Sequence, residues 1–213
     1  MKIKTTEIFH SIQGESTLTG ERFSFVRLTG CPLRCSYCDT AYAFTGGTWM
    51  EIAEIVSQVC AHETKWVLIT GGEPLAQPHC LDLVLALKKA GKKISIETSG
   101  EKLVELYAGH TKIIMDIKTP SSGEKAALCF ENLKYLLPSD EIKFVLCNFE
   151  DYEWVKNICN EYTLTNRFCV LFSPAFEELS LKDLAAWILK DKLNVRLQTQ
   201  LHKHIWGKDK TGV

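Results

Sequence analysis

The sequence lacks a long hydrophobic run and lacks an excess of either charge. No apolar stretch in its 213 residues approaches the roughly 18–20 residues of a membrane helix, and its first ten residues hold no apolar segment like that of a signal peptide. Lys and Arg total 25 against 26 for Asp and Glu, whereas a large nucleic-acid surface needs a basic excess. We therefore expect a soluble cytoplasmic protein that binds neither a membrane nor nucleic acid directly.

The sequence also lacks internal repeats, low-complexity tracts and long linkers, so it offers no boundary between domains. A domain typically has about 100–200 residues, and a content of 46% hydrophobic and 24% charged residues is typical of a packed globular chain. We expect residues 1–213 to form a single domain.

Cysteine, by contrast, is abundant, and the nine cysteines are an odd number that cannot all pair within one chain. In a reducing compartment such cysteines are metal ligands, catalytic thiols or small core residues rather than disulfides. Three of them fall within eight residues. The other six are scattered, mostly over apolar segments, and are expected to be buried core residues: Cys60, Cys80, Cys129, Cys147, Cys159 and Cys169.

Short strand-like runs alternate with amphipathic helical patterns after residue 20. Several runs are almost wholly apolar or β-branched, as in strands that are covered on both faces. Strands are predicted at 23–28, 66–70, 93–97, 112–117, 141–147, 168–172 and 194–197. Helices are predicted at 50–60, 78–90, 103–108, 125–137, 149–160 and 180–190, the last with Ser180 as its capping residue.

Repeated strand–helix units predict an α/β fold with parallel strands joined by right-handed crossovers. A closed eight-unit barrel typically needs about 250 residues, so this shorter chain, with about six units, favours an incomplete, open β/α barrel. A doubly wound sheet is the alternative. In both architectures the functional groups gather at the carboxyl ends of the strands.

The three clustered cysteines, Cys31, Cys35 and Cys38, form a C-x3-C-x2-C motif directly after the first predicted strand. Thiolates this close can converge on one soft metal centre. A tetrahedral zinc site needs four ligands, and the next histidine is the distant His62, whereas a four-iron cluster held by three cysteines keeps one iron open. The spacing therefore leaves open a cluster, a zinc site completed by a distant histidine, and three core cysteines.

Three later motifs also follow predicted strands. Gly71, Gly72 and Glu73 follow the second strand, where the glycines allow a ligand to approach the backbone. The exposed backbone amide and carbonyl groups together with Glu73 suit a zwitterionic amino acid. The third strand runs into a Thr-Ser-Gly turn, and the fourth runs into Lys118 and a Ser/Gly-rich turn. Each motif alone is a common turn, and their order relative to the cysteines makes them informative.

Together these motifs resemble those of the radical S-adenosylmethionine (SAM) enzymes, in which C-x3-C-x2-C binds a [4Fe–4S] cluster and GGEP holds the amino group of SAM. The likeness narrows to the 7-carboxy-7-deazaguanine synthase family and spans essentially the whole chain. Its marks are EIFHSIQGES at 7–16, CDT at 38–40, IETSG at 96–100 and QLHKHIWGKDKTGV at 200–213.

The resemblance implies a reaction, its cofactors and its partners. In such enzymes a radical generated from SAM abstracts hydrogen from 6-carboxy-5,6,7,8-tetrahydropterin, after which the ring contracts, ammonia is lost and 7-carboxy-7-deazaguanine forms. SAM is regenerated, and the product leads towards queuosine in tRNA, which is a downstream recipient rather than a partner. The resemblance further implies Mg²⁺, an electron donor such as flavodoxin or ferredoxin, and a homodimer.

The resemblance also implies which residues bind the cofactors. Two segments depart from the forms typical of relatives, with Asp116-Ile-Lys118 in place of Ser-Pro-Lys and Ser173-Pro174 in place of Gln-Pro. Cluster ligation is implied for Cys31, Cys35 and Cys38, and magnesium binding for Thr40. SAM binding is implied for Tyr37, Cys38, Asp39, Gly71, Gly72, Glu73, Gly100, Asp116, Lys118 and Ser173.

The substrate contacts that the resemblance implies match the chemistry of a carboxylated pterin. Gln13 and Glu15 offer an amide and a carboxylate to its guanidine-like edge, and Arg27 can pair with its carboxylate through a charge-assisted fork. Without the family context, Arg27 reads equally as part of a salt bridge. The full implied set is Ile12, Gln13, Gly14, Glu15, Arg27, Thr98, His202 and the C-terminal Val213.

Two other functions fit the cysteine motif. A glycyl-radical enzyme activase has the same motif and a comparable size but acts on a glycine of another protein, and a zinc-binding interaction module would use the same three thiolates. The IQGE segment and the segment around Thr98 favour a small-molecule pocket. Anaerobic metal analysis with a product assay distinguishes these functions.

Overall fold

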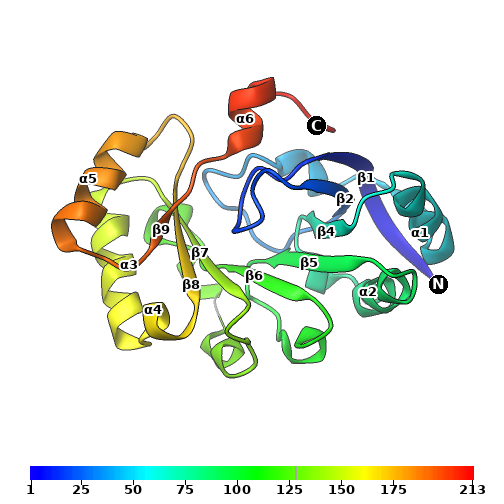
Figure 1. Cartoon of the computed structure of the whole chain (residues 1–213), viewed down its shortest axis with the longest axis horizontal. Coiled ribbons are helices and arrows are strands. Elements are labelled where there is room, and N and C mark those ends of the chain that lie inside the picture. Colours follow the sequence, from blue (N-terminus) through cyan, green and yellow to red (C-terminus); the bar gives the residue numbers. More distant parts are fainter. Residues whose placement is uncertain (128) are drawn as a thin grey trace.

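A single curved sheet organises the chain, of which the computed structural model describes residues 1–127 and 129–213 (Figure 1). Its strands are β1 (Lys2–Ile12), β2 (Arg22–Leu28), β3 (Thr48–Glu51), β4 (Trp66–Gly71), β5 (Lys93–Thr98), β6 (Lys112–Asp116), β7 (Glu141–Leu146), β8 (Cys169–Pro174) and β9 (Arg196–Leu197). Their order is β3-β1-β2-β4-β5-β6-β7-β8-β9, antiparallel at β1 and parallel from β2 onwards. Within the described residues β3 and β9 are unpaired edges, so the predicted open β/α barrel is confirmed.

Helices lie around the outside of the sheet, and the short C-terminal helix α6 (Leu201–Trp206) lies over its inner side (Figure 1). The α-helices are α1 (Ile52–Ala61), α2 (Cys80–Lys89), α3 (Phe149–Glu161), α4 (Leu164–Arg167), α5 (Leu181–Asp191) and α6 (Leu201–Trp206). The 3-10 helices are η1 (Ala41–Ala43), η2 (Pro74–Ala76), η3 (Glu105–Tyr107), η4 (Pro120–Ser122), η5 (Lys125–Ala127) and η6 (Phe130–Lys134). No helix within the described residues is long and apolar enough to span a bilayer.

All seven predicted strands are present, with ends shifted by a few residues. Apolar side chains of these strands, from β2 to β8, are buried in the core, whereas the short edge strand β9 is exposed. Four predicted helices are confirmed as α1, α2, α3 and α5. The capping role of Ser180 is also confirmed, since its hydroxyl accepts hydrogen bonds from the backbone amides of Lys182 (3.1 Å) and Asp183 (3.4 Å).

Two predicted helices are wrong. The segment 103–108 holds only η3, and 125–137 holds the short helices η5 and η6, while its residue 128 lies outside the described residues. The fully buried Asn132 explains this, because its amide accepts from the Val104 amide (3.0 Å) and donates to the carbonyls of Gly100 and Lys102 (2.9 Å each). A side chain that satisfies loop backbone groups competes with regular helix formation.

Three further expectations need correction. Strand β1 was not predicted, although its last residue, Ile12, was expected to contact the substrate, and β3 takes the start of the helix predicted at 50–60. Among the scattered cysteines Cys80 and Cys159 are buried as expected, but Cys60 is exposed on α1, and Cys129, Cys147 and Cys169 are half-buried.

The loop between β1 and β2, residues 13–21, reaches across the sheet to its far strands. The backbone amide of Thr17 donates to Glu141 at the start of β7 (3.2 Å), and that of Ser16 donates to Gln198, which follows β9 (2.8 Å). Glu141 is fully buried and also pairs with Lys112 of β6 (2.9 Å). The loop therefore connects the first hairpin to the last strands of the open barrel.

Candidate active site

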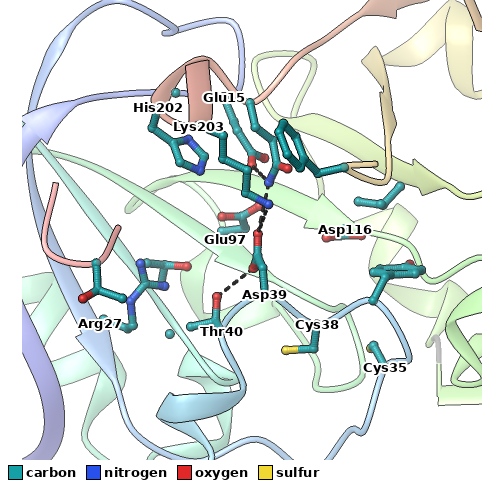
Figure 2. A pocket seen from close by; sticks show the side chains of 18 of the residues that line it. Glu15, Arg27, Cys35, Cys38, Asp39, Thr40, Glu97, Asp116, His202 and Lys203 are labelled. Carbon is teal, nitrogen blue, oxygen red and sulfur yellow. Dashed lines mark hydrogen bonds and ion pairs between the residues drawn. The ribbon is translucent and has the colours of Figure 1, made fainter. Parts of the chain in front are cut away.

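A cavity of about 630 Å³ lies at the carboxyl ends of the parallel strands. Its walls come from the loops after these strands, from the loop 13–21 and from the C-terminal segment that includes α6 (Figure 2). Of the residues predicted for cluster, SAM, magnesium or substrate, the structure brings together all but Glu73, Gly100 and Ser173 in this lining.

The cysteine loop after β2 is stabilised by the side chain of Arg34. The guanidinium of Arg34 donates to the carbonyls of Cys31 (2.8 Å) and Leu33 (2.6 Å), and it lies 4.4 Å from the ring centre of Phe44. All three thiols of the motif are half-buried and line the cavity, so they are accessible to a metal centre bound there. Burial raises the pKa of the thiols of Cys31 and Cys35, an effect that the nearby Lys118 ammonium opposes.

The donor set fits an iron–sulfur cluster. Thiolates are the ligands that such clusters use, and each of three cysteines binds a different iron. In residues 1–127 and 129–213 no three His, Cys, Asp or Glu side chains converge closely enough to hold one metal ion. A cluster spreads its ligands over several metal atoms and does not need that convergence.

The double glycine after β4 allows close contact between backbones. A Cβ at Gly71 would overlap the carbonyl oxygen of Leu28, and one at Gly72 would overlap that of Gly30, next to the cysteine loop. The space beside the glycines, where a ligand was expected to approach the backbone, is therefore occupied by residues at the end of β2 and just after it. Both glycines still line the cavity. We infer that the glycines place the cysteine loop against β4.

Glu73 lies outside the cavity lining and is fully buried. One carboxylate oxygen accepts hydrogen bonds from the Leu75 amide (3.0 Å) and the Thr98 hydroxyl (2.8 Å). The other accepts from the amide and the hydroxyl of Ser99 (2.7 Å each). Glu73 thus joins the loops after β4 and β5 and orients Thr98, which does line the cavity.

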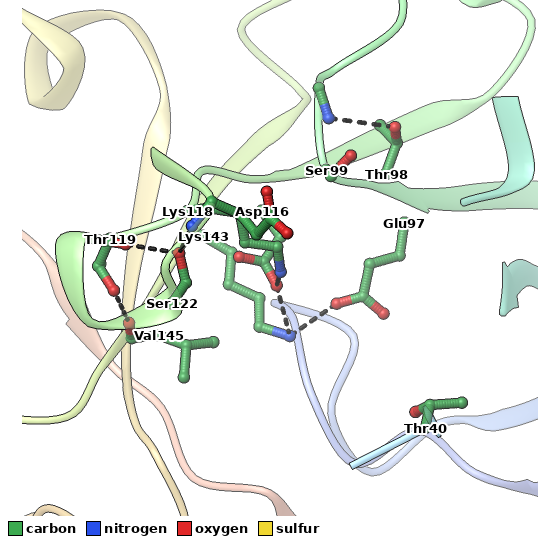
Figure 3. A network of polar contacts seen from close by, with 12 residues as sticks. Thr40, Glu97, Thr98, Ser99, Asp116, Lys118, Thr119, Ser122, Lys143 and Val145 are labelled. Atoms are coloured by element: carbon green, nitrogen blue, oxygen red, sulfur yellow. Dashed lines mark hydrogen bonds and ion pairs between the residues drawn. The ribbon is translucent and has the colours of Figure 1, made fainter. Parts of the chain in front are cut away.

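A polar pair at the end of β6 forms another wall of the cavity (Figure 3). Asp116 Oδ2 pairs with Lys118 Nζ (3.0 Å), and Lys118 Nζ lies 6.0 Å from the ring centre of Tyr37. Within the described part of the chain the buried Oδ1 of Asp116 has no hydrogen-bond partner. An unsatisfied buried oxygen in a cavity wall is a position at which a polar ligand can bind.

The C-terminal segment is attached to the cysteine loop and to the loop 13–21 (Figure 2). Lys203 pairs with Asp39 (2.8 Å), and the Gln200 amide donates to Glu15 (2.8 Å) and to Asp39 (3.2 Å). A Cβ at Gly14 would overlap the ring of His202, so only glycine allows this approach. Partial burial opposes ionisation of Asp39, but Lys203 and the Thr40 hydroxyl hold its pKa below the ordinary range.

Arg27 lines the cavity and is already paired within the protein. Its Nε donates to Glu7 Oε1 (2.6 Å), an oxygen that also accepts from the Tyr42 hydroxyl (2.8 Å). Burial and the neighbouring Glu7 raise the pKa of Tyr42 to about 12 although Arg27 opposes them. Of the Arg27 nitrogens, only Nε pairs with Glu7. Val213 lines the same cavity.

Several charged residues of the cavity lining were not predicted as functional, among them Glu97, Lys143 and Lys203. Lys143 lies in the middle of β7 and is buried, and a lysine between the apolar residues Ile142 and Phe144 was the available signal. Glu97 was visible only as part of a family motif. Lys203 likewise lies in a family motif, at 200–213, but was not singled out from it.

Comparison with known proteins identifies close relatives. A model of the radical SAM superfamily matches residues 25–123. The 7-carboxy-7-deazaguanine synthase of Koribacter versatilis is 41% identical, over 99% of this chain and 100% of its own, and that of Chlorobaculum tepidum is 40% identical, over 99% and 97%. The crystal structure of QueE from Escherichia coli has a TM-score of 0.77 at 24% identity and covers 95% of both chains, which shows the shared fold.

These relatives favour neither a glycyl-radical enzyme activase nor a zinc-binding module. The identity to curated synthases extends over the full length of the chain, beyond the segment that the superfamily model matches. The chain therefore belongs to the 7-carboxy-7-deazaguanine synthase family of radical SAM enzymes.

Proposed function

We propose that the protein converts 6-carboxy-5,6,7,8-tetrahydropterin into 7-carboxy-7-deazaguanine with loss of ammonia, in queuosine biosynthesis. The observation that carries this proposal is the identity of 41% to a curated synthase over the whole of both chains. The single cavity that combines three cysteines with carboxylate, amide and guanidinium groups supports it. The product is a precursor for tRNA modification, so the enzyme needs no tRNA surface of its own.

The cofactors of the superfamily are a [4Fe–4S] cluster and SAM, which together supply the radical that abstracts a hydrogen atom. In our proposal Cys31, Cys35 and Cys38 hold the cluster. Lys118 and Asp116 offer a cation and a free carboxylate oxygen to the polar end of SAM, and Tyr37 packs against its adenine. Gly71, Gly72 and Asp39 also line the cavity. Glu73 acts indirectly, through its hydrogen bonds to Thr98 and Ser99. Gly100 and Ser173 lie outside the cavity lining, and their contacts with SAM remain predictions.

The substrate is bound on the side formed by the loop 13–21 and the C-terminal segment. The Glu15 carboxylate accepts hydrogen bonds from the guanidine-like edge of the pterin, and the Gln13 amide donates to that edge. Arg27, oriented by Glu7, pairs with the substrate carboxylate. Backbone groups of Ile12 and Gly14 complete the pocket. His202, Thr98 and the end of the chain at Val213 enclose the ring.

An anaerobic product assay tests the proposed function. Protein with a reconstituted cluster, incubated with SAM, a reductant and the pterin, is expected to form 7-carboxy-7-deazaguanine and ammonia in equal amounts, measured by chromatography with mass detection. If 5′-deoxyadenosine accumulates while no deazapurine forms, radical generation is intact and the proposed substrate is wrong.

Magnesium is a further part of the proposal. The hydroxyl of Thr40 donates to Asp39 Oδ1 (2.9 Å) beside the cavity, and oxygen donors with open positions suit Mg²⁺. We expect chelation to lower the rate and added Mg²⁺ to restore it, and Thr40→Val to raise the Mg²⁺ concentration for half-maximal rate at least about tenfold. Thr48→Val, at an exposed threonine of β3, is the control and should leave this titration unchanged.

An electron donor is needed to reduce the oxidised cluster before it can act on SAM. We also propose that a flavodoxin or a ferredoxin is this donor, that the protein forms a homodimer, and that it is located in the cytoplasm. Size-exclusion chromatography with light scattering tests the assembly, and reduction of the cluster by each purified donor tests the partner.

A further inference from the structure

Lys143 lies where the groups proposed to bind the substrate meet those proposed to bind SAM (Figure 3). Only 7% of its side chain is exposed. Its ammonium group donates to Glu15 of the loop 13–21 and to Glu97 Oε1 at 2.6 Å, and it lies 3.8 Å from Asp116 Oδ2. One lysine thus contacts carboxylates from three separate segments of the chain.

The two glutamates differ in how the protein compensates their charge. Burial disfavours the ionised form of Glu15, but Lys143, His202 and the Gln200 amide outweigh it and lower its pKa. Burial dominates at Glu97 and raises its pKa, because Glu15 and Asp116 oppose the effect of Lys143. The other titratable groups that act on this cluster are Asp39, from the cysteine loop, and His202, from α6.

Both glutamates line the cavity, and they share one cation. Two carboxyl groups bound to the same ammonium lie close enough to share a proton or to repel each other when that ammonium is removed. In either event the pterin would lose acceptors that it needs in fixed positions.

We propose that Lys143 is a positioning residue that holds Glu15 and Glu97 in fixed positions as two acceptors for the guanidine-like edge of the substrate. This role rests on the proposed function. It adds Glu97 to the substrate contacts and explains why a lysine is buried in the middle of β7. Lys143 touches no reacting atom, and its effect is on substrate binding through its two partners.

The test measures KM and kcat for the pterin in reconstituted enzyme carrying Lys143→Met, Glu97→Gln or both. We expect Lys143→Met to raise KM about tenfold or more with a much smaller change in kcat, because the carboxyl groups lose their shared cation. In this variant KM should also rise with pH as Glu97 ionises beside Glu15. The double variant should return to within about threefold of Glu97→Gln alone, since removing one carboxylate removes the repulsion.

Lys112→Met is the matched control. Lys112 also pairs with a buried glutamate, Glu141, but lies outside the cavity lining, so its loss should affect stability without the pH-dependent KM. If Lys143→Met does not fold, the double variant is compared with Glu97→Gln, and a KM more than about tenfold higher in the double variant overturns the proposal.

The remaining outcomes separate failure of the positioning role from failure of the proposed function. A wild-type KM in Lys143→Met, or a loss of binding that is independent of pH and unchanged by Glu97→Gln, overturns the positioning role while the wild-type product assay still supports the function. Wild-type enzyme that forms no deazapurine overturns both.

Discussion

Replacing Cys31, Cys35 and Cys38 together by alanine is expected to give a folded, colourless protein that contains no iron and forms neither 5′-deoxyadenosine nor deazapurine. The three thiols line the cavity from one loop, and each is assigned to a different iron, so no cluster can assemble without them. The fold should persist, because the loop is held by backbone and Arg34 contacts rather than by the thiols. Iron content, visible absorption and circular dichroism measure these outcomes.

The control for this variant removes the same number of thiols elsewhere. Cys60 is exposed, and Cys129 and Cys169 are half-buried outside the cavity lining, so alanine at these three positions should leave iron content and product formation near wild-type values. Retention of a full cluster by the first variant would show that the ligands are assigned to the wrong cysteines. Stoichiometric zinc in anaerobic wild-type protein would contradict the cluster itself.

Replacing Glu73 by leucine should destabilise the protein by about 3–5 kcal/mol, because four donors lose a fully buried acceptor. For a chain of this length that loss corresponds to a decrease in Tm of roughly 10 °C. Glu73→Gln keeps one acceptor oxygen and should have a smaller effect. Thermal unfolding of protein without SAM measures the loss independently of cofactor binding.

The matched control is Glu105→Leu, an exposed glutamate at the start of η3, which should change Tm by no more than a degree or two, about the effect of an ordinary surface substitution. If Glu73→Leu instead keeps the wild-type Tm and loses SAM affinity, then Glu73 binds the cofactor directly. Loss of both would fit the role assigned here, since Thr98 and Ser99 depend on Glu73 for their orientation.

Much of the site follows from local sequence signals. The strand predictions placed the segments after β2, β4, β5 and β6 at one edge of the sheet, and the parallel arrangement brings their motifs into one cavity. The family motifs added the loop 13–21 and the C-terminal segment. These predictions succeed because short apolar runs and turn residues report local structure directly.

The rest depends on contacts between distant parts of the chain. The sequence shows that Glu73 follows a double glycine but not that Thr98 and Ser99 saturate its carboxylate. The sequence at 125–137 has an amphipathic pattern that predicts a helix, yet Asn132 binds the loop at 100–104 instead. Lys143 likewise gains its partners from residues 46 and 128 positions away.

The loop 13–21 also has a consequence for the order of folding. Its hydrogen bonds join residues 124 positions apart at Thr17 and Glu141 and 182 apart at Ser16 and Gln198. Because such contacts close very long chain loops, we expect them to form after the neighbouring strands have paired. Catalytic competence should thus appear as the slowest kinetic phase of refolding, later than the recovery of secondary structure.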